Sequence, residues 1–372
     1  FHARDRSAHK KTIVVIDQFV PRFDKDAGSK NTYQYLKLFV FMGYNVKFIG
    51  NDFRCEEPYT SELEKLGIEV LYGRHYQLHW KQWFKDNAAS IDFVYLNRPD
   101  ISLRYIDIIK ENCSAKLIYF VHDLHFLREK RRFLVEGDAK INLESNYWYS
   151  KEKQVFDKAH VILTPNKDEE NIVRQINPAY DVKTIPLNYF EAKSNAISSF
   201  EDRSGLLFVG GFDHVPNVDA MIWFCNEILP TICKSLPEIK LYIVGSNAPD
   251  SIRNLASENI CVLGYLSDVE LKQLYTKSRI AIIPLRYGAG VKGKTLEAMN
   301  LGLPLVSTTI GIEGIPDVSN FLVGQDNAID FANEVINLYP NFEMLKEKSV
   351  HETNYINQFF NKQAAISCMQ RV

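Results

Sequence analysis

The stretch RIAIIPLRYGAGVKGKTLEAMNLGLPLVSTTIGIEG, residues 279–314, carries the strongest local signature of the 372-residue chain. Its pattern predicts a short apolar strand ending at Pro284, a loop containing Gly288 and Gly290, a helix over about residues 292–301, and a second strand. Glycines let backbone N–H groups approach a ligand closely, and a helix start carries partial positive charge. A strand, a glycine loop and a helix in this order therefore predict an anion site.

Charged residues at the start of this helix indicate the kind of anion. Lys292 and Lys294 follow the loop residues Gly290 and Val291, and Glu297 lies one turn further into the helix. A carboxylate there is poorly placed to meet a phosphate but well suited to accept hydrogen bonds from sugar hydroxyls. The simplest ligand that offers both groups is a nucleotide diphosphate, and we expect these five residues to bind it.

The composition limits the class of protein. A chain of 372 residues exceeds the size of one ordinary core, so two domains are expected. The net charge of -2 argues against a nucleic-acid partner, because phosphate-backbone affinity needs a strong basic excess. The six cysteines show no paired CxxC spacing, which favours reduced thiols in the cytoplasm over a disulfide frame or a zinc site.

No targeting or membrane-spanning segment is evident. No apolar run approaches the roughly 18 residues of a membrane helix, and the apolar run after the basic start is too short for a secretory signal. We expect a cytoplasmic protein, with peripheral contact at the inner face of a membrane left open. Because the chain begins with Phe1, we expect either one module of a longer polypeptide or added residues at this end.

Strands and helices alternate in both halves of the chain. This alternation predicts parallel sheets with helices on both faces, in which ligands bind at the carboxyl ends of the strands. The predicted strands of the first half span residues 12–16, 46–49, 68–71, 93–96, 117–121, 161–163 and 182–185. Those of the second half span residues 206–209, 241–244, 261–263, 280–284 and 304–307, with helices over 218–229, 251–256 and 268–277 between them.

Loss of periodicity marks the domain boundary. Residues 188–204 are polar without a steady period, which is typical of a linker. We therefore predict an N-terminal Rossmann-like domain over residues 1–190 and a C-terminal one over residues 191–354, facing a central cleft. A helix over about residues 355–372 is expected to pack back on the first domain.

Two strand ends of the first half carry candidate site residues. Gly28 lies at a strand-to-helix turn, where the following helix offers its N–H groups. Asp24 and Asp26 nearby spell DxD, which either holds a divalent metal or, as is more common for aspartates in a loop, is solvated. A second apolar strand ends directly at His122 and Asp123, which either work in proton exchange near a ligand or cap the strand end.

Three further features of the sequence allow either a functional or a purely structural interpretation. Lys130, Arg131 and Arg132 are expected to form a solvated helix face, with an anionic membrane surface or a lipid diphosphate as the other possibility. Gly211 follows a strand of the second half, in a turn that either faces a ligand or has only a structural role. Tyr265 follows another strand and either stacks on a nucleotide base or packs against the protein.

Taken together, the segments PLRYGAGVKGKTLEAMNLGLPLVSTTIGIEG, FVGGFDHVPNVDAMIWF, HDLHFLRE and DKDAGS resemble, in sequence and order, the GT-B retaining glycosyltransferases of family 4, the glycosyl transferases group 1 of polysaccharide biosynthesis. The resemblance covers nearly the whole chain. It implies an α/β fold with two Rossmann-like domains, a nucleotide sugar on the C-terminal domain, a glycan or lipid-linked acceptor on the N-terminal one, and neither metal nor cofactor.

The resemblance also implies roles for single residues. Glu297 matches the glutamate that holds the ribose hydroxyls, while Lys292 and Lys294 match basic positions that face the diphosphate. His122 and Asp123 fall where the family has a histidine near donor sugar and acceptor, and Gly28 matches a glycine near the phosphates. Gly211, Tyr265, Gly290 and Val291 complete the expected donor-binding set.

One departure concerns the donor sugar. The commoner family motif has two glutamates separated by seven residues, and the position of the first is Ala289 here. The basic pair usual at the start of the second domain is also missing from GGFDHVPN, which shifts phosphate binding onto Lys292 and Lys294.

We expect transfer of a sugar to a hydroxyl with retention. A nucleotide-sugar epimerase of similar architecture and a silent carbohydrate-binding module are the alternatives.

Overall fold

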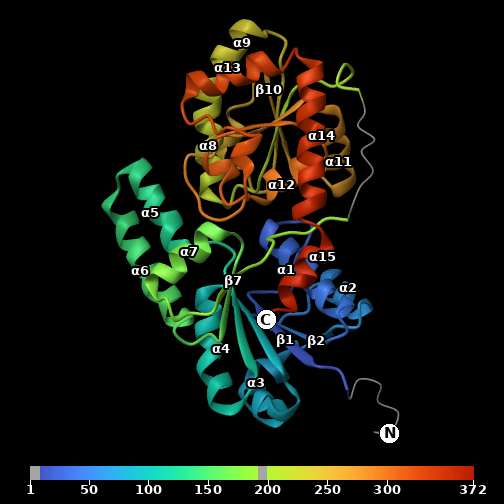
Figure 1. Cartoon of the computed structure of the whole chain (residues 1–372), viewed down its shortest axis with the longest axis vertical. Coiled ribbons are helices and arrows are strands. Elements are labelled where there is room, and N and C mark those ends of the chain that lie inside the picture. The colour runs from blue at the N-terminus through green and yellow to red at the C-terminus, as the bar shows by residue number, and fades with distance from the viewer. Residues whose placement is uncertain (1–8, 192–198) are drawn as a thin grey trace. The chain divides into compact units, whose positions relative to one another are not determined.

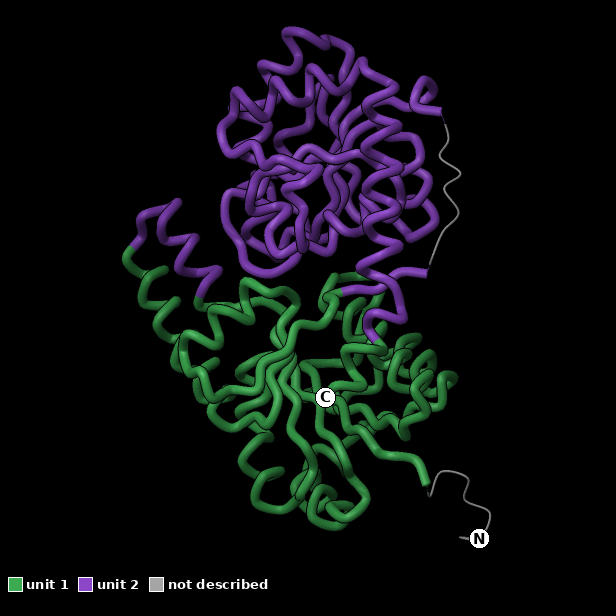
Figure 2. Tube along the Cα trace, in the orientation of Figure 1, with its two compact units in different colours: residues 1–126, 139–187, 366–372 green, residues 127–138, 188–365 purple. Residues whose placement is uncertain are grey.

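The computed structural model describes residues 9–191 and 199–372, which group into two compact units (Figures 1 and 2). Unit 1 holds the chain up to residue 126, residues 139–187 and residues 366–372. Unit 2 holds residues 127–138 and 188–365. Residues 192–198 of the predicted linker and the first eight residues of the chain lie outside the described residues.

Unit 1 is built on a seven-stranded parallel sheet with the strand order β3-β2-β1-β4-β5-β6-β7. Its central strands are fully buried runs of apolar residues, as expected for a sheet covered on both faces. The strands are β1 (Thr12–Asp17), β2 (Asn45–Gly50), β3 (Glu69–Val70), β4 (Phe93–Asn97), β5 (Lys116–Phe120), β6 (Val161–Thr164) and β7 (Val182–Thr184).

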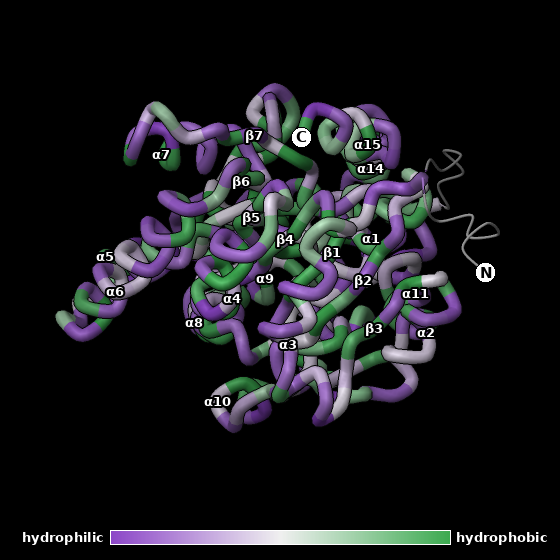
Figure 3. The backbone as a smooth tube through the Cα atoms, turned by 90° about the horizontal axis from the view of Figure 1, so that it is seen from below, coloured by the Kyte–Doolittle hydropathy of each residue, from purple (hydrophilic) through white to green (hydrophobic). Residues whose placement is uncertain are grey.

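Helices connect these strands. They are α1 (Ala27–Phe41), α2 (Tyr59–Lys65), α3 (Arg74–Asn87), α4 (Pro99–Asn112), α5 (His125–Glu136), α6 (Ala139–Phe156) and α7 (Lys167–Ile176), with a short 3-10 turn η2 (Ala88–Ser90) after α3. Along α6 hydrophilic and hydrophobic residues alternate (Figure 3). Leu143 and Tyr147 on this helix are exposed. All but the first residues of α5 group with unit 2.

Unit 2 contains a five-stranded parallel sheet with the order β10-β9-β8-β11-β12. Its strands are β8 (Leu206–Val209), β9 (Leu241–Val244), β10 (Ile260–Gly264), β11 (Ile280–Ile283) and β12 (Leu305–Ser307). Its helices are α8 (Val215–Trp223), α9 (Leu229–Ser235), α10 (Asp250–Arg253), α11 (Asp268–Lys277), α12 (Gly293–Asn300), α13 (Ala328–Leu338), α14 (Phe342–Phe359) and α15 (Lys362–Met369), the last of which continues into unit 1. Short turns are η3 (Phe224–Ile228), η4 (Ile310–Ile312) and η5 (Val318–Asn320).

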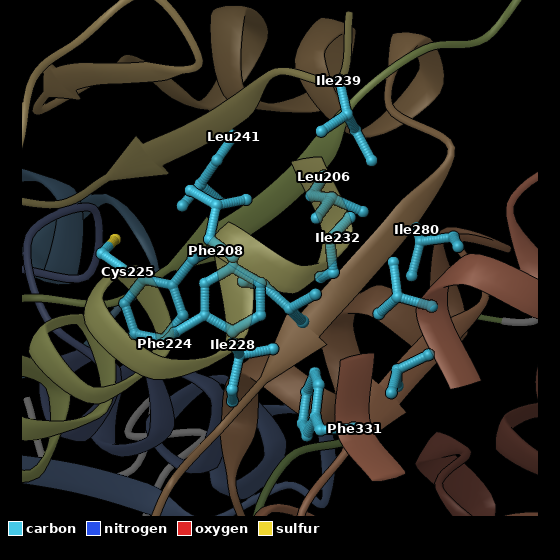
Figure 4. Packing of buried hydrophobic residues seen from close by; sticks show 14 of the residues in the cluster. Leu206, Phe208, Phe224, Cys225, Ile228, Ile232, Ile239, Leu241, Ile280 and Phe331 are labelled. Carbon is cyan, nitrogen blue, oxygen red and sulfur yellow. The ribbon is translucent and has the colours of Figure 1, made fainter. Parts of the chain in front are cut away.

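The core of unit 2 lies between its sheet and the helices α8, α9 and α13 (Figure 4). Phe208 from β8, Phe224 from η3 and Phe331 from α13 are fully buried in it. Phe224 and Phe331 meet edge to face, with their ring centroids 5.8 Å apart. Each buried aromatic side chain of this size contributes about 1.5–3 kcal/mol to folding, so this cluster fixes the sheet on which the glycine loop is mounted.

The predicted strands are confirmed in type and closely in position, because each one is an apolar run bounded by turn residues. Gly43 and Gly67 have φ of 87° and 82° after α1 and α2, the left-handed conformation in which glycine commonly ends a helix. One predicted helix, residues 218–229, is not a regular α-helix. It opens into a π turn, η3, just before Pro230, which has no N–H for the carbonyl four residues earlier.

None of the helices within residues 9–191 and 199–372 combines the length and the apolar character needed to cross a bilayer.

Candidate functional site

The glycine loop of unit 2 has the predicted order of strand, loop and helix. β11 ends at Ile283, and α12 begins at Gly293. Gly288 and Gly290 have φ of 151° and 71°, a region that side-chain-bearing residues rarely adopt, so the course of this loop requires glycine. The Thr295 hydroxyl donates to the carbonyl of Gly311 over 2.7 Å and fastens the start of α12 to the segment after β12.

Lys294 occupies a corner formed by two strand ends and the helix start. Its ammonium donates to Oδ1 of Asn217, on α8, and lies 4.4 Å from the ring centroid of Phe208. Burial and, as the smaller cause, the neighbouring charge of Lys292 together lower the pKa of Lys294 to about 7. An anion beside this ammonium would relieve the cost of holding a charge there, so the corner is suited to a phosphate.

The glycine beside Lys294 at this corner is Gly210, the neighbour of the predicted Gly211, whose role in donor binding stays a prediction. A Cβ on Gly210 would lie 2.6 Å from Nζ of Lys294 and 2.8 Å from Nδ2 of Asn217, so any larger residue would force these two side chains to shift. Gly211 is exposed, and a Cβ there would have its nearest neighbour, the Ser246 hydroxyl, at 3.6 Å. Gly211 serves instead through its carbonyl, which accepts from Asn217 over 2.6 Å.

Lys292 precedes α12 and points toward a carboxylate. Its ammonium donates to the carbonyl of Gly290 and lies 3.4 Å from Oε2 of Glu313. Arg131, from α5, holds the same carboxylate with two bonds, at 2.7 Å and 2.5 Å, and donates to the carbonyl of Gly288 over 2.7 Å. Two cations thus flank Glu313, and both also bind carbonyls of the glycine loop.

These contacts correct the expectation for the basic run of α5. Only Lys130 is exposed as expected of a solvated face. The side chain of Arg131 is 25% exposed and engaged with Glu313, and Arg132 pairs with Glu136 at 2.9 Å. Contact of this basic run with an anionic membrane surface stays a prediction.

The remaining predicted donor residues lie on or near the same sheet edge. Ala289 and Val291 are buried within the loop. Glu297 lies on α12 near the buried phenol of Tyr275, whose pKa is raised well above 10 by burial and further by this carboxylate. Tyr265 directly follows β10 and is 43% exposed, as a residue that stacks on a ligand would be.

In unit 1, His122 lies at the carboxyl end of the sheet, where the sequence predicts it. Its Nε2 is 3.1 Å from Oδ1 of Asn97, and Nδ2 of that amide donates to the carbonyl of Ile16 over 3.0 Å. With the amide so oriented, Nε2 carries the hydrogen and Nδ1 is an acceptor. Burial and nearby Arg98 lower the pKa of His122 to about 4, so the ring is neutral at pH 7. A neutral ring suits hydrogen bonding to a hydroxyl better than proton transfer at that pH.

An ion pair that the sequence did not reveal lies beside His122. Arg98 donates through Nε to Oδ1 of buried Asp17 over 2.8 Å, and the Thr32 hydroxyl donates to Oδ2 over 2.7 Å. Burial pushes the pKa of Asp17 up, but Arg98, His122 and Thr32 outweigh it and hold that pKa below its usual value. A Cβ on Gly28 would lie 3.2 Å from the Arg98 guanidinium, so the predicted Gly28 is close to this cation.

Two buried carboxylates hold the turn between β5 and α5. Glu152 accepts from the backbone N–H groups of His125 and Phe126, at 2.9 Å and 3.1 Å, and Glu169 accepts from that of Leu124 over 3.2 Å. The turn that carries His122 and Asp123 is therefore fixed by side chains from α6 and α7. Asn166 caps α7 by accepting from the backbone N–H of Glu169, which leaves the Glu169 side chain to accept from the N–H of Leu124.

The DxD aspartates have partners within the protein. Asp26 caps α1 by accepting from the Ser29 N–H over 2.8 Å, and Asp24 accepts from the Tyr59 hydroxyl over 2.7 Å. No group of three or more potential metal ligands is found within residues 9–191 and 199–372.

Asn188 is another residue that the sequence concealed, since it falls in the predicted linker. It is 7% exposed, and its Nδ2 would lie 3.3 Å from a Cβ on Gly293, the first residue of α12. Its Oδ1 has no hydrogen-bond partner within the described part of the chain. Its place at the start of α12 comes from the tertiary fold, and no local signal in the sequence indicates it.

Part of the second half is similar to a known protein family. Residues 203–341 match the model of the family described as Glycosyl transferases group 1. A curated protein of Klebsiella pneumoniae, described as an uncharacterized 44.6 kDa protein in the cps region, is 32% identical over 171 residues. That match covers 44% of this chain and 44% of the relative, so it spans less than half the length of either.

Solved structures share the fold over almost the full chain. Sucrose-phosphate synthase from Thermosynechococcus elongatus has a TM-score of 0.73 at 14% identity, covering 97% of this chain and 98% of that one. Anabaena HepE in complex with UDP-glucose has a TM-score of 0.70 at 14% identity, with coverage of 97% and 98%. The pneumococcal O-GlcNAc transferase GtfA in complex with UDP and GlcNAc has a TM-score of 0.67 at 12% identity, with 98% of both chains covered. Residues 203–341 are therefore similar to the family described as Glycosyl transferases group 1, and the two-unit fold of the chain is shared with these solved glycosyltransferase structures.

Proposed function

We propose that this protein transfers a sugar from a nucleotide diphosphate donor to a hydroxyl of a glycan or lipid-linked saccharide in surface-polysaccharide biosynthesis, with retention at the anomeric carbon. The observation that carries the proposal is the corner at Lys294. A half-buried ammonium whose pKa is lowered to about 7 lies at the start of α12, beside a glycine loop that requires two left-handed residues. The family of residues 203–341 and the description of the Klebsiella relative support it further.

Electrostatics supplies the chemistry. The bond between the anomeric carbon of the sugar and the diphosphate breaks, the acceptor oxygen forms the new bond to that carbon, and the acceptor's proton passes to an oxygen of the departing phosphate. Negative charge gathers on the leaving diphosphate, and preorganised cations and N–H groups lower the energy of that charge. Lys292, Lys294 and the N–H groups at the start of α12 supply such groups. Glu297 lies one turn into the helix and binds ribose hydroxyls, and Tyr265 stacks on the base.

Unit 1 is assigned the acceptor. The neutral imidazole of His122 presents Nδ1 as a hydrogen-bond acceptor for a hydroxyl, and Asp123 follows it on the turn held by Glu152 and Glu169. No metal ion and no cofactor enter the proposed reaction.

Titration of the full chain with UDP-, GDP- and dTDP-sugars tests the donor site. Calorimetry should detect binding of at least one of them to the wild type, and Lys294→Ala and Glu297→Ala should each weaken it about tenfold or more, as expected for loss of a charged hydrogen bond. Unchanged binding in both variants would contradict the assignment of the site.

A second assay separates transfer from epimerisation. The donor that binds is incubated alone and with a lipid-linked acceptor, and the products are separated by mass spectrometry and NMR. A new glycosidic bond with the anomeric configuration of the donor is expected only when acceptor is present. An epimerised nucleotide sugar formed without acceptor would contradict the proposal.

A further inference from the structure

Glu313 is an anion placed where the proposed donor also brings negative charge. Its side chain is 17% exposed, and it lies next to the glycine loop through its contacts with Lys292 and Arg131. Left alone with Lys292, a carboxylate at this position would compete with a diphosphate for the lysine. The geometry around Glu313 shows how that competition is reduced.

The two cations hold Glu313 unequally. Both carboxylate oxygens accept from Arg131, at 2.7 Å and 2.5 Å, in the two-pronged arrangement that makes arginine–carboxylate pairs strong. Lys292 lies 3.4 Å from Oε2, longer than the 2.7–2.9 Å that is usual for a charged hydrogen bond. The charge of Glu313 is therefore satisfied mainly by Arg131.

Helix α5 also supports the loop itself. Arg131 donates to the carbonyl of Gly288 over 2.7 Å, and one turn later Glu136 accepts from the hydroxyl of buried Tyr287 over 3.1 Å. All of these contacts lie within unit 2. Two residues of α5 thus fasten the loop that leads to Lys292.

We infer that Arg131 is a positioning residue for donor binding, which holds the loop at Gly288 and occupies Glu313 so that Lys292 serves the diphosphate. This inference rests on the proposed function. Without Arg131, Glu313 has only Lys292 to neutralise it, and the lysine is drawn from the phosphates to the carboxylate. The carbonyl of Gly288 loses its donor at the same time.

The test is a set of variants of the full chain titrated with UDP, GDP and dTDP by calorimetry. For the diphosphate that binds the wild type, Arg131→Ala should weaken affinity about tenfold, as expected for loss of a charged contact. Arg131→Lys, which keeps the charge without the fork, should fall in between. The double variant Arg131→Ala/Glu313→Gln should recover most of the affinity, because no carboxylate is left to hold Lys292. Damage to the fold would instead make the double variant weaker than the single one.

Two comparisons make the result specific. Lys130→Ala is the control, because it removes a neighbouring basic side chain of α5 that is exposed, and the affinity of this variant should stay within about twofold of wild type. The matching nucleoside monophosphates should show a smaller loss with Arg131→Ala, because they bring less charge to Lys292.

The outcomes separate the inference from the proposed function. Wild-type affinity in Arg131→Ala, or a double variant at least as weak as Arg131→Ala alone, overturns the role of Arg131 when Lys294→Ala has lost binding. Wild-type affinity in Lys294→Ala, or no binding of any of the three diphosphates, overturns the donor site and the inference with it.

Discussion

The ammonium of Lys294 lies between the ring of Phe208 and the amide of Asn217, on a half-buried side chain. Burial there lowers its pKa to about 7, so the ligand-free protein holds a mixture of amine and ammonium at neutral pH. A bound diphosphate favours the charged form and raises this pKa. Binding and protonation of Lys294 are therefore linked.

This linkage predicts a pH dependence of nucleotide affinity. As pH rises above about 7, a growing share of the protein must take up a proton in order to bind, so affinity should fall by up to about tenfold per pH unit until the pKa of the complex is reached. Calorimetry at pH 6.5 and 8.5, in two buffers with different ionisation enthalpies, should show the loss of affinity and the proton uptake. The uptake should vanish in Lys294→Ala, and equal uptake in that variant would assign it to another group.

Gly210 and Gly211 cannot be told apart in the sequence, but they have different surroundings in the structure. Sequence places two adjacent glycines after a strand, and nothing local distinguishes them. Only Gly210 lies against Lys294, which comes 84 residues later in the chain, whereas both glycines are close to Asn217. Contacts over such separations are set by the packing of the sheet, so the sequence indicates the turn but not the critical glycine.

At the scale of elements, the ends of β8 and β9 approach each other through glycine. Gly210 donates to the carbonyl of Val244 over 2.9 Å, and a Cβ on Gly245 would lie 2.0 Å from the carbonyl oxygen of Gly210. Because that neighbour is backbone, it cannot swing aside. The close spacing of these two strand ends supports the corner at Lys294.

Gly245→Ala should therefore destabilise the protein by about 1–3 kcal/mol or more, the usual cost of overpacking a close contact. Chemical denaturation followed by circular dichroism measures this loss. Gly211→Ala is the control for the same pair of strand ends, because its Cβ would meet nothing closer than 3.6 Å, and its free energy of unfolding should change by no more than about 0.5 kcal/mol. Equal losses in both variants would contradict the argument from close contact.

Helix α14 carries a carboxyl group buried against β12. Oε1 of Glu352 accepts from the N–H of Leu305 over 3.4 Å, and Oε2 has no hydrogen-bond partner within the described part of the chain. Burial raises the pKa of Glu352 to about 8, although the charge of Lys348 opposes the rise. The folded protein therefore holds a proton at Glu352 that the unfolded chain, with its ordinary value of 4.5, releases.

The proton at Glu352 makes the stability of the fold depend on pH. Because the folded-state pKa of Glu352 lies above the unfolded one, the stability linked to this proton is fully present below about pH 4.5 and is lost as pH rises toward about 8. Glu352→Gln, which has no proton to lose, should gain on the wild type by more than about 1 kcal/mol in free energy of unfolding between pH 5 and pH 8. Denaturation at both pH values checks this. Glu347→Gln, on the exposed side of α14, should track the wild type, and a gain of the same size there would contradict a specific role of burial.

The elements that the sequence predicts well are those whose signal is local. Parallel strands buried on both faces are continuous apolar runs, and α11 lies over the predicted residues 268–277 because Ser267 and Glu270 form a capping box. The role of α5 was missed because Arg131 meets Glu313 across 182 residues of sequence. A run of three basic residues looks like a solvated face until its partners are known.

For the whole molecule, the fold follows from sequence more readily than the reaction does. Two runs of alternating strands and helices predict two Rossmann-like units, and the structure shows both sheets with all strands parallel. The division of labour between donor and acceptor, the retention of configuration and the domain limits of 1–190 and 191–354 stay predictions. The donor sugar is the least predictable part, because the usual first glutamate is replaced by Ala289, a buried residue with no polar side chain.

The central claim is that unit 2 holds the diphosphate of a nucleotide sugar at the start of α12. A crystal structure of the full chain with the nucleoside diphosphate that binds in calorimetry tests it most directly. The account predicts a phosphate oxygen within hydrogen-bond distance of Nζ of Lys294 and of backbone N–H groups at Gly293 and Lys294, with Lys292 turned from Glu313 toward the phosphates. A nucleotide bound elsewhere, with Lys294 still hydrogen-bonded to Asn217 and no phosphate beside it, would contradict a diphosphate site at the start of α12.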